Sequence, residues 1–294
     1  MLPGLIKTMR PRQWSKNVFV FVAIFFDRQL NEPASVLRAG AAFILLCLMS
    51  SAVYIMNDLA DIENDRQHPK KQHRPLPSNQ ISPRSAGIAA VVLALGSLAA
   101  GLLIEPAFGT VLFAYLMIQI AYTFWLKHVV LVDVFIIATG FILRIAAGVA
   151  VLETVQRFSP WLYVFGGFLA LFLALGKRRH ELVLLGAEAG NHRAILNEYT
   201  LELIDRLIGI VTTSTLVAYS LYTFLSEGLP HNHVMMLTIP FLLYAMFRYL
   251  YLVHVRGEGG APEEIVLNDR PLQITLVLFA MVAFVALYVM PEGA

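Results

Sequence analysis

Four acidic side chains occur within eight residues at the end of a long apolar run: Asp58, Asp61, Glu63 and Asp65, directly after Asn57. If the preceding helix continues through them, Asn57, Asp61 and Asp65 recur every four residues and share one face, with Asp58 at its edge. Hard oxygen ligands on one helical face suit Mg²⁺, which takes one or two carboxylates and leaves its other positions to water and substrate phosphate. The sequence therefore predicts a magnesium site made by Asn57, Asp58, Asp61 and Asp65.

Acidic residues at a membrane boundary have a second interpretation, as solvated loop residues. Carboxylates this close together repel one another unless a counter-charge lies among them. Basic residues follow directly within positions 66–74, so neutralisation by neighbours is the alternative. A metal that bridges to a diphosphate would explain both the acidic stretch and its basic surroundings.

The composition places these residues in a membrane protein. The chain has 294 residues, 58% of them hydrophobic and 14% charged, and its mean hydropathy is +0.68. A single soluble core cannot bury that much apolar surface. The net charge of +2 gives no argument for nucleic acid as a partner. Cys47 is the only cysteine, which excludes an internal disulfide.

Apolar windows long enough to cross about 30 Å of hydrocarbon predict nine transmembrane helices. Lys16, Asn17 and Asp27 interrupt the ends of the first window, and the third and ninth windows are the cleanest. The expected fold is an all-α, nine-helix bundle that forms a single polytopic domain over residues 1–294. The windows are at about 15–31, 38–57, 86–104, 107–126, 130–151, 160–176, 207–226, 234–253 and 272–290.

The orientation follows from the basic residues between the windows. Most of them share the side of the N-terminal tail, which is a strong positive-inside signal. The three long segments, at about 58–85, 177–206 and 254–271, lie on that same side. We therefore expect the N-terminus and the acidic site in a cytoplasmic pocket of the inner (plasma) membrane, with the C-terminus outside.

A few polar residues inside or next to the windows are candidates for substrate binding. Arg144 interrupts an apolar run, where a charge costs several kcal/mol on insertion scales unless it faces a polar cavity. It is interpreted as a phosphate contact, with a structural ion pair to Asp133 or to a neighbouring helix as the alternative. Lys16 and Asn17 begin the first window and could reach the same pocket, or they could anchor the membrane interface together with Trp14.

Residues 57–65 fit the NDxxDxxxD pattern of the UbiA superfamily of membrane prenyltransferases, and the chain resembles that superfamily over nearly its whole length. The nine-helix expectation agrees with the fold of this superfamily. Several further stretches look like one branch, the decaprenyl-phosphate phosphoribosyltransferases. They are RPRQWSKN at 10–17, HRPL at 73–76, GFILR at 140–144, LGKRRHEL at 175–182 and NDRP at 268–271.

One departure from the superfamily favours that branch. Prenyl-transferring members usually carry a second DxxxD motif between the sixth and seventh helices, whereas this chain has the basic residues 177–179 and Glu181 there. A cationic cluster repels a metal ion but binds phosphate oxygens directly. Glu198, Glu202 and Asp205 form an acidic stripe further on, interpreted as the polar face of an interfacial helix, with a displaced second metal site as the alternative.

The resemblance implies a Mg²⁺-dependent transferase. It would move the 5-phosphoribosyl group of phosphoribosyl pyrophosphate to a polyprenyl (decaprenyl) phosphate and release pyrophosphate, for lipid-linked pentose and cell-envelope glycan (arabinan) synthesis. Asp58, Asp61 and Asp65 would be the catalytic residues, since the metal they hold neutralises the leaving group. The expected substrate-binding residues are Lys16, Asn17, Arg74, Lys127, Arg144, Lys177, Arg178, Glu181 and Arg270.

Two alternatives remain open from the sequence. A member of the same superfamily could instead transfer a prenyl group from its diphosphate to an aromatic acceptor, although the missing second DxxxD motif argues against this. A non-enzymatic, transporter-like bundle could use the acidic face to bind a transported cation. The basic cluster at 177–179 and the one-sided long segments argue against that function.

Overall fold

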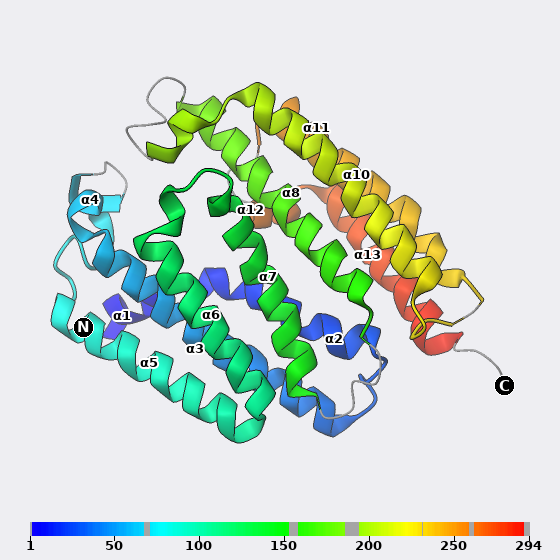
Figure 1. The fold of residues 1–294 in the computed structure, drawn as a ribbon, viewed down its shortest axis with the longest axis horizontal. Helices are drawn as coiled ribbons and strands as arrows, with labels where there is room; N and C mark the ends of the chain where they lie inside the picture. The colour runs from blue at the N-terminus through cyan, green and yellow to red at the C-terminus, as the bar shows by residue number, and fades with distance from the viewer. Residues whose placement is uncertain are drawn as a thin grey trace. The chain divides into compact units, whose positions relative to one another are not determined.

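The computed structural model describes residues 2–67, 71–152, 158–185, 194–230, 232–258 and 262–290, and the regular secondary structure in this part of the chain is all helical (Figure 1). The elements are α1 Leu2–Met9, η1 Pro11–Val20, α2 Phe21–Phe26, α3 Pro33–Ala60, α4 Ile62–Gln67, η2 Lys71–His73, α5 Pro83–Ile104, α6 Pro106–Phe124, η3 Leu126–His128, α7 Val132–Val151, α8 Pro160–Leu185, η5 Ala194–Glu198, α10 Leu201–Leu225, η6 Val234–Thr238, α11 Ile239–His254, α12 Pro262–Asn268, α13 Arg270–Phe284 and the π-helical turn η7 Val285–Val289.

The helix starts follow from local sequence. Helices α3, α5, α6 and α8 each begin with a proline, whose fixed φ suits the first helical position and whose missing N–H would have no helical partner there. Side-chain oxygens cap α5 as well as two other starts: Ser82 accepts from the Ser85 N–H at 3.1 Å, and Thr200 and Asp269 cap α10 and α13 in the same way.

Eight helices of the described chain are long and apolar enough to cross a membrane, so the protein is a multi-pass membrane protein. They match eight of the nine predicted windows. The first window, at about 15–31, instead contains the 3₁₀ segment η1 and the six-residue helix α2, so the nine-helix count is not confirmed. A reason is visible at Asn17, which is fully buried and bonds to other side chains rather than facing lipid.

Two helices extend beyond their predicted ends. Helix α3 continues to Ala60, into the acidic motif, where the apolar window ends near residue 57. Helix α8 continues to Leu185, nine residues past the predicted window that ends at 176. Lys177 and Arg178 are therefore helical residues rather than members of a loop.

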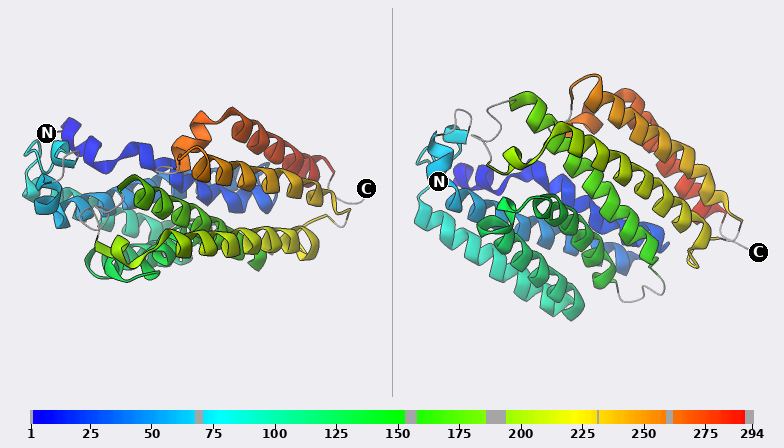
Figure 2. Two further views of the ribbon diagram at one scale, coloured as in Figure 1. Left: turned by 90° about the horizontal axis from the view of Figure 1, so that it is seen from above. Right: turned by 45° about the horizontal axis from the view of Figure 1, so that its top comes forward.

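The described chain divides into two compact units. Unit 1 comprises 1–25, 29–127 and 143–155, and unit 2 comprises 26–28, 128–142 and 156–294. In unit 1, α3 packs against α5 and α6; in unit 2, α8 packs along α10 and α11 packs against α13 (Figure 2). The acidic motif belongs to unit 1. The single polytopic domain over 1–294 stays a prediction.

A small apolar core in unit 1 fixes the segment that follows the motif. Ile55, Leu76, Ile81 and Ala86 are almost completely buried and pack together. Leu76 belongs to the connection between η2 and α5, so this contact anchors the connection to α3. The neighbouring Arg74 is thereby held close to the motif carboxylates.

Gly148 of α7 lies directly against the backbone of η1. A Cβ atom at this position would come within 2.0 Å of the carbonyl oxygen of Val20, a contact that no side-chain rotation relieves. We expect Gly148→Ala to lower the free energy of unfolding by about 1–3 kcal/mol or more, measured by thermal unfolding in detergent. Gly96→Ala on α5 is the control, because no described atom lies within 4 Å of its new methyl group. Equal unfolding temperatures for the two variants would contradict the contact.

Candidate active site

The acidic motif follows an almost continuous helical path with one break. Asn57 and Asp58 lie in the last turn of α3, which ends at Ala60. Asp61 leaves the helical conformation at φ −101° and ψ 9°, yet its N–H still donates to the Asn57 carbonyl at 3.0 Å. Helix α4 follows at once, and the Asp65 N–H donates to the Asp61 carbonyl at 2.8 Å. The helical turn is therefore nearly preserved across the motif.

Asp58 and Asp65 converge on one cationic nitrogen. Both are buried, with 3% and 2% of their surface exposed. Arg74 Nη1 donates to Asp58 Oδ1 at 3.2 Å and to Asp65 Oδ2 at 2.7 Å. Seven residues are nearly two helical turns, which brings the two carboxylates to the same face. Arg10 also donates to Asp58 Oδ1, and Lys71 Nζ lies 3.5 Å from Asp65 Oδ1.

Asn57 and Asp61 have other partners. Lys127 Nζ donates to Asp61 Oδ1 at 2.8 Å, and 38% of the Asp61 side chain is exposed. The Thr123 hydroxyl donates to Asn57 Oδ1. The two side chains that converge on Arg74 are thus Asp58 and Asp65, which are two of the four predicted metal ligands.

These contacts test whether a divalent metal fits the motif. Among the described residues, no group of three or more His, Cys, Asp and Glu side chains is arranged to hold a metal ion. Two carboxylates do converge on the Arg74 nitrogen, so their oxygens already surround a positive charge. Magnesium takes one or two protein carboxylates and fills its other positions with water and phosphate. The donor set therefore fits a metal that is completed by a substrate phosphate.

Arg10 contacts the acidic motif through Asp58, although the sequence did not identify Arg10 as a site residue. Its backbone is left-handed, with φ 54° and ψ 61°, an unusual conformation for a residue other than glycine. Its guanidinium lies 5.1 Å from the centre of the Tyr54 ring. The sequence feature that could have identified Arg10 is the RPRQWSKN stretch at 10–17, of which it is the first residue. This stretch was used only as support for the family resemblance.

Arg144 is buried in unit 1, with 6% of its surface exposed. Its Nε donates to Asn17 Oδ1 at 2.8 Å, and its Nη2 donates to the Tyr115 hydroxyl at 3.0 Å. Asn17 in turn donates to Ser50 Oγ at 3.2 Å. Uncharged side chains thus provide dipoles around this charge. Lys16, next to Asn17, is half-buried.

Arg178 is buried in unit 2 among acidic partners. Its Nε donates to Asp133 Oδ2 at 2.9 Å and its Nη1 donates to Glu181. The Tyr199 hydroxyl donates to Asp133 Oδ1 at 2.6 Å. Burial, together with this hydrogen bond, raises the pKa of Tyr199 to about 12, so the phenol stays protonated at neutral pH. In the basic cluster at 177–179, Lys177 is exposed, whereas the charge of Arg178 is neutralised by the carboxylates of Asp133 and Glu181.

Arg270 is exposed in the first turn of α13. Asp269 caps this helix by accepting from the Leu272 N–H at 2.9 Å. Arg248 of α11 donates to both Asp269 oxygens, at 3.2 and 2.8 Å. These hydrogen bonds from Arg248 lower the pKa of Asp269.

The acidic stripe of unit 2 is divided among separate partners. Asp205 accepts from Arg179 Nε at 2.7 Å, and Glu202 pairs with Arg206 on the exposed face of α10. Glu198 lies before α10, in η5. Within the described residues, the stripe forms no convergent metal site.

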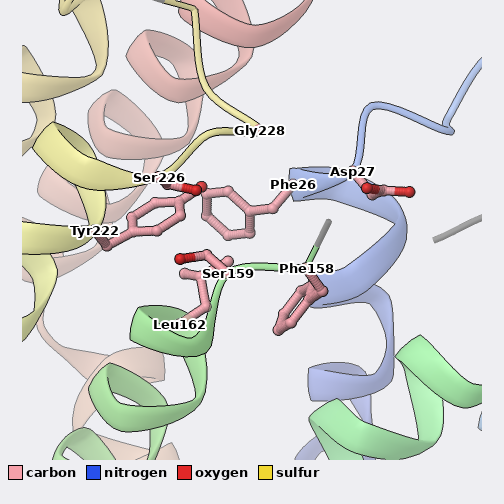
Figure 3. A pocket seen from close by; sticks show the side chains of 8 residues that line it. All are labelled: Phe26, Asp27, Phe158, Ser159, Leu162, Tyr222, Ser226 and Gly228. Carbon is pink, nitrogen blue, oxygen red and sulfur yellow. The ribbon is translucent and has the colours of Figure 1, made fainter. Parts of the chain in front are cut away.

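Unit 2 also contains a cavity of about 20 Å³ (Figure 3), which has room for about one water molecule. Phe26 and Tyr222 meet edge to face at its wall, with ring centres 5.7 Å apart. None of the predicted site residues contributes to this wall. The lining residues are Phe26, Asp27, Phe158, Ser159, Leu162, Tyr222, Ser226 and Gly228.

The sequence of this chain, with its eight long apolar helices and its carboxylate motif at the end of α3, is similar to those of known proteins. The sequence matches the UbiA prenyltransferase family over residues 17–181. The decaprenyl-phosphate phosphoribosyltransferase of Mycobacterium tuberculosis is 34% identical over 93% of this chain and 91% of its own length. The enzyme of the same name from Corynebacterium glutamicum is 32% identical over 98% of this chain and 88% of its own length.

The solved structures agree on the fold. The structure of a UbiA homologue from Archaeoglobus fulgidus bound to DMAPP and Mg²⁺ superposes with a TM-score of 0.75 at 18% identity, covering 97% of this chain and 99% of that chain. The chain described here belongs to the UbiA prenyltransferase family. Its relatives over nearly the full length carry the name decaprenyl-phosphate phosphoribosyltransferase.

Proposed function

We propose that this protein transfers the 5-phosphoribosyl group of phosphoribosyl pyrophosphate to a polyprenyl phosphate such as decaprenyl phosphate, and releases pyrophosphate. The observation that carries this proposal is the identity of 34% with a decaprenyl-phosphate phosphoribosyltransferase over 93% of the chain. The basic residues 177–179, where prenyl-transferring relatives are expected to have a second aspartate motif, support the same reaction.

In this reaction the bond between the ribose anomeric carbon and pyrophosphate breaks, and a bond forms between that carbon and an oxygen of the lipid phosphate. Positive charge develops on the ribose ring and negative charge on the leaving group. Bound Mg²⁺ supplies Lewis-acid neutralisation of that leaving group. Asp58 and Asp65 are the residues that would hold it, with Asp61 and Asn57 as further oxygen donors. The lipid phosphate is already ionised at neutral pH, so no general base is needed.

The basic side chains of unit 1 are the proposed contacts to phosphate oxygens. Arg74 and Lys127 already bind the motif carboxylates through nitrogens that can equally donate to phosphate. Lys16, Asn17 and Arg144 are proposed to bind the substrate from the end of η1 and from α7. In unit 2, the exposed Lys177 and Arg270 are proposed phosphate contacts. Arg178 and Glu181 are predicted substrate-binding residues whose observed partners give them a structural role as well.

The proposed setting is the inner (plasma) membrane with the N-terminus and the motif on the cytoplasmic side and the C-terminus outside. The concentration of basic residues beside the motif supports this orientation. A cytoplasmic pocket would admit the water-soluble sugar donor, while the polyprenyl chain stays in the bilayer. The lipid-linked pentose product suits the synthesis of cell-envelope glycans.

The test is an assay of the purified protein in detergent with Mg²⁺, polyprenyl phosphate and phosphoribosyl pyrophosphate labelled either in the ribose or in the pyrophosphate. The ribose label should enter the lipid phase, and the pyrophosphate label should stay in water. Excess EDTA should lower the rate by about a hundredfold or more, and added Mg²⁺ should restore it. If no label enters the lipid while a prenyl diphosphate is consumed with an aromatic acceptor, the protein is a prenyltransferase instead.

A further inference from the structure

Each carboxylate of the predicted metal site, Asp58, Asp61 and Asp65, is already paired with a basic side chain from another part of unit 1. Arg10 and Arg74 hold Asp58, Arg74 and Lys71 hold Asp65, and Lys127 holds Asp61. These partners come from the N-terminal segment, from the segment after α4, and from η3. The pairing is therefore a property of the folded unit rather than of one helix.

The charges in this cluster do not favour a free metal ion. Within the described part of unit 1, these three carboxylates face four basic side chains, so the cluster has no excess of negative charge. A free divalent cation must displace a guanidinium or ammonium group from each carboxylate it binds, and it is then repelled by that group. A diphosphate changes this balance, because its oxygens accept the displaced donors and its negative charge offsets theirs.

We propose that Arg10, Arg74 and Lys127 act as exchangeable counter-cations that compete with the divalent metal for the motif and couple its binding to that of the diphosphate. Without diphosphate they bind the carboxylates; with diphosphate they turn to its oxygens and leave the carboxylates to the metal. The inference rests on the proposed function for the identity of the diphosphate. It adds Arg10 to the binding residues and makes metal binding and diphosphate binding mutually dependent.

Arg10→Met and Lys127→Met test this exchange, since methionine keeps most of the side-chain volume but carries no charge. In each variant Mn²⁺ alone should bind about fivefold or more tightly than in the wild type, measured from the EPR signal of free Mn²⁺. Pyrophosphate at saturating Mn²⁺ should bind about fivefold or more weakly, measured by equilibrium dialysis of the labelled anion. Lys7→Met removes a charge from the same N-terminal segment at an exposed position, and both affinities should stay within about twofold.

The opposite directions of the two shifts separate exchange from structural damage. A purely structural role for Arg10 and Lys127 would weaken both affinities, and that result, or an unchanged Mn²⁺ affinity in both variants, would overturn the inference. If Arg10→Met does not fold, the Lys127→Met variant tests the exchange alone, since Lys127 is partly exposed. Opposite shifts in a protein that transfers no phosphoribosyl group would keep the exchange and refute the proposed reaction. Transfer without these shifts would refute only the exchange.

Discussion

Replacing Asp61 with asparagine should lower the rate of phosphoribosyl transfer by about 10²–10³-fold while leaving the fold intact. The substitution keeps the size of the side chain and removes its negative charge. Because 38% of the side chain is exposed, losing its pair with Lys127 should cost at most about 1 kcal/mol of folding free energy. The transfer assay gives the rate, and thermal unfolding in detergent checks the fold.

The neighbouring Glu63 provides the matched control for Asp61. It lies two residues further along, is 74% exposed, and pairs with Arg66 at 2.7 Å outside the convergent cluster. Glu63→Gln should therefore keep the rate within about twofold. Full activity of Asp61→Asn would remove Asp61 from the proposed metal chemistry.

Replacing Arg178 with methionine should lower the free energy of unfolding by about 3–5 kcal/mol. The change leaves Asp133, whose side chain has no exposed surface, without its guanidinium partner. Because methionine fills much the same volume as arginine, the loss of unfolding free energy comes from the missing charge rather than from a cavity. The double variant Arg178→Met with Asp133→Leu should recover much of the stability, because neither buried charge remains.

The pair formed by Glu202 and Arg206 is the control for this prediction. Both side chains are 75% exposed and lie one helical turn apart on α10. Arg206→Met should change the free energy of unfolding by no more than about 0.5 kcal/mol. Comparable losses for Arg178→Met and Arg206→Met would contradict a structural role for the buried ion pair.

The long helices could be predicted from the sequence because crossing hydrocarbon requires about 20 apolar residues, and such windows are unmistakable. The first window was the exception. The polar residues at 16 and 17 made this window a weaker candidate for a membrane span. Only the packing shows that Asn17 binds Arg144 and Ser50 inside unit 1. A hydropathy window cannot separate a lipid-facing span from a buried segment stabilised by other helices.

The sequence identified the motif as a group, whose role in metal binding stays a prediction, but it did not identify which two carboxylates converge. Helical spacing favoured Asn57, Asp61 and Asp65, whereas the break at Asp61 and the position of Arg74 bring Asp58 and Asp65 together. Partners distant in sequence, such as Arg10 for Asp58, depend on how the helices pack. Local spacing carries no information about such contacts. The sequence therefore predicted the positions of the long helices, but it could not predict which side chains pair inside the site.

The buried Arg144 has a consequence for how the protein enters the membrane. Chains are synthesised and inserted from the N-terminus, so η1 and α6 precede α7 at the translocon. Asn17 and Tyr115, which accept hydrogen bonds from the Arg144 guanidinium, are therefore synthesised before it. Asp133 has the reverse order, since Arg178 follows it, but it lies in the first turn of α7 and can stay hydrated at the membrane surface until α8 is made. The order of the chain thus offers each of the two buried charges a polar environment during insertion: earlier partners for Arg144 and the membrane surface for Asp133.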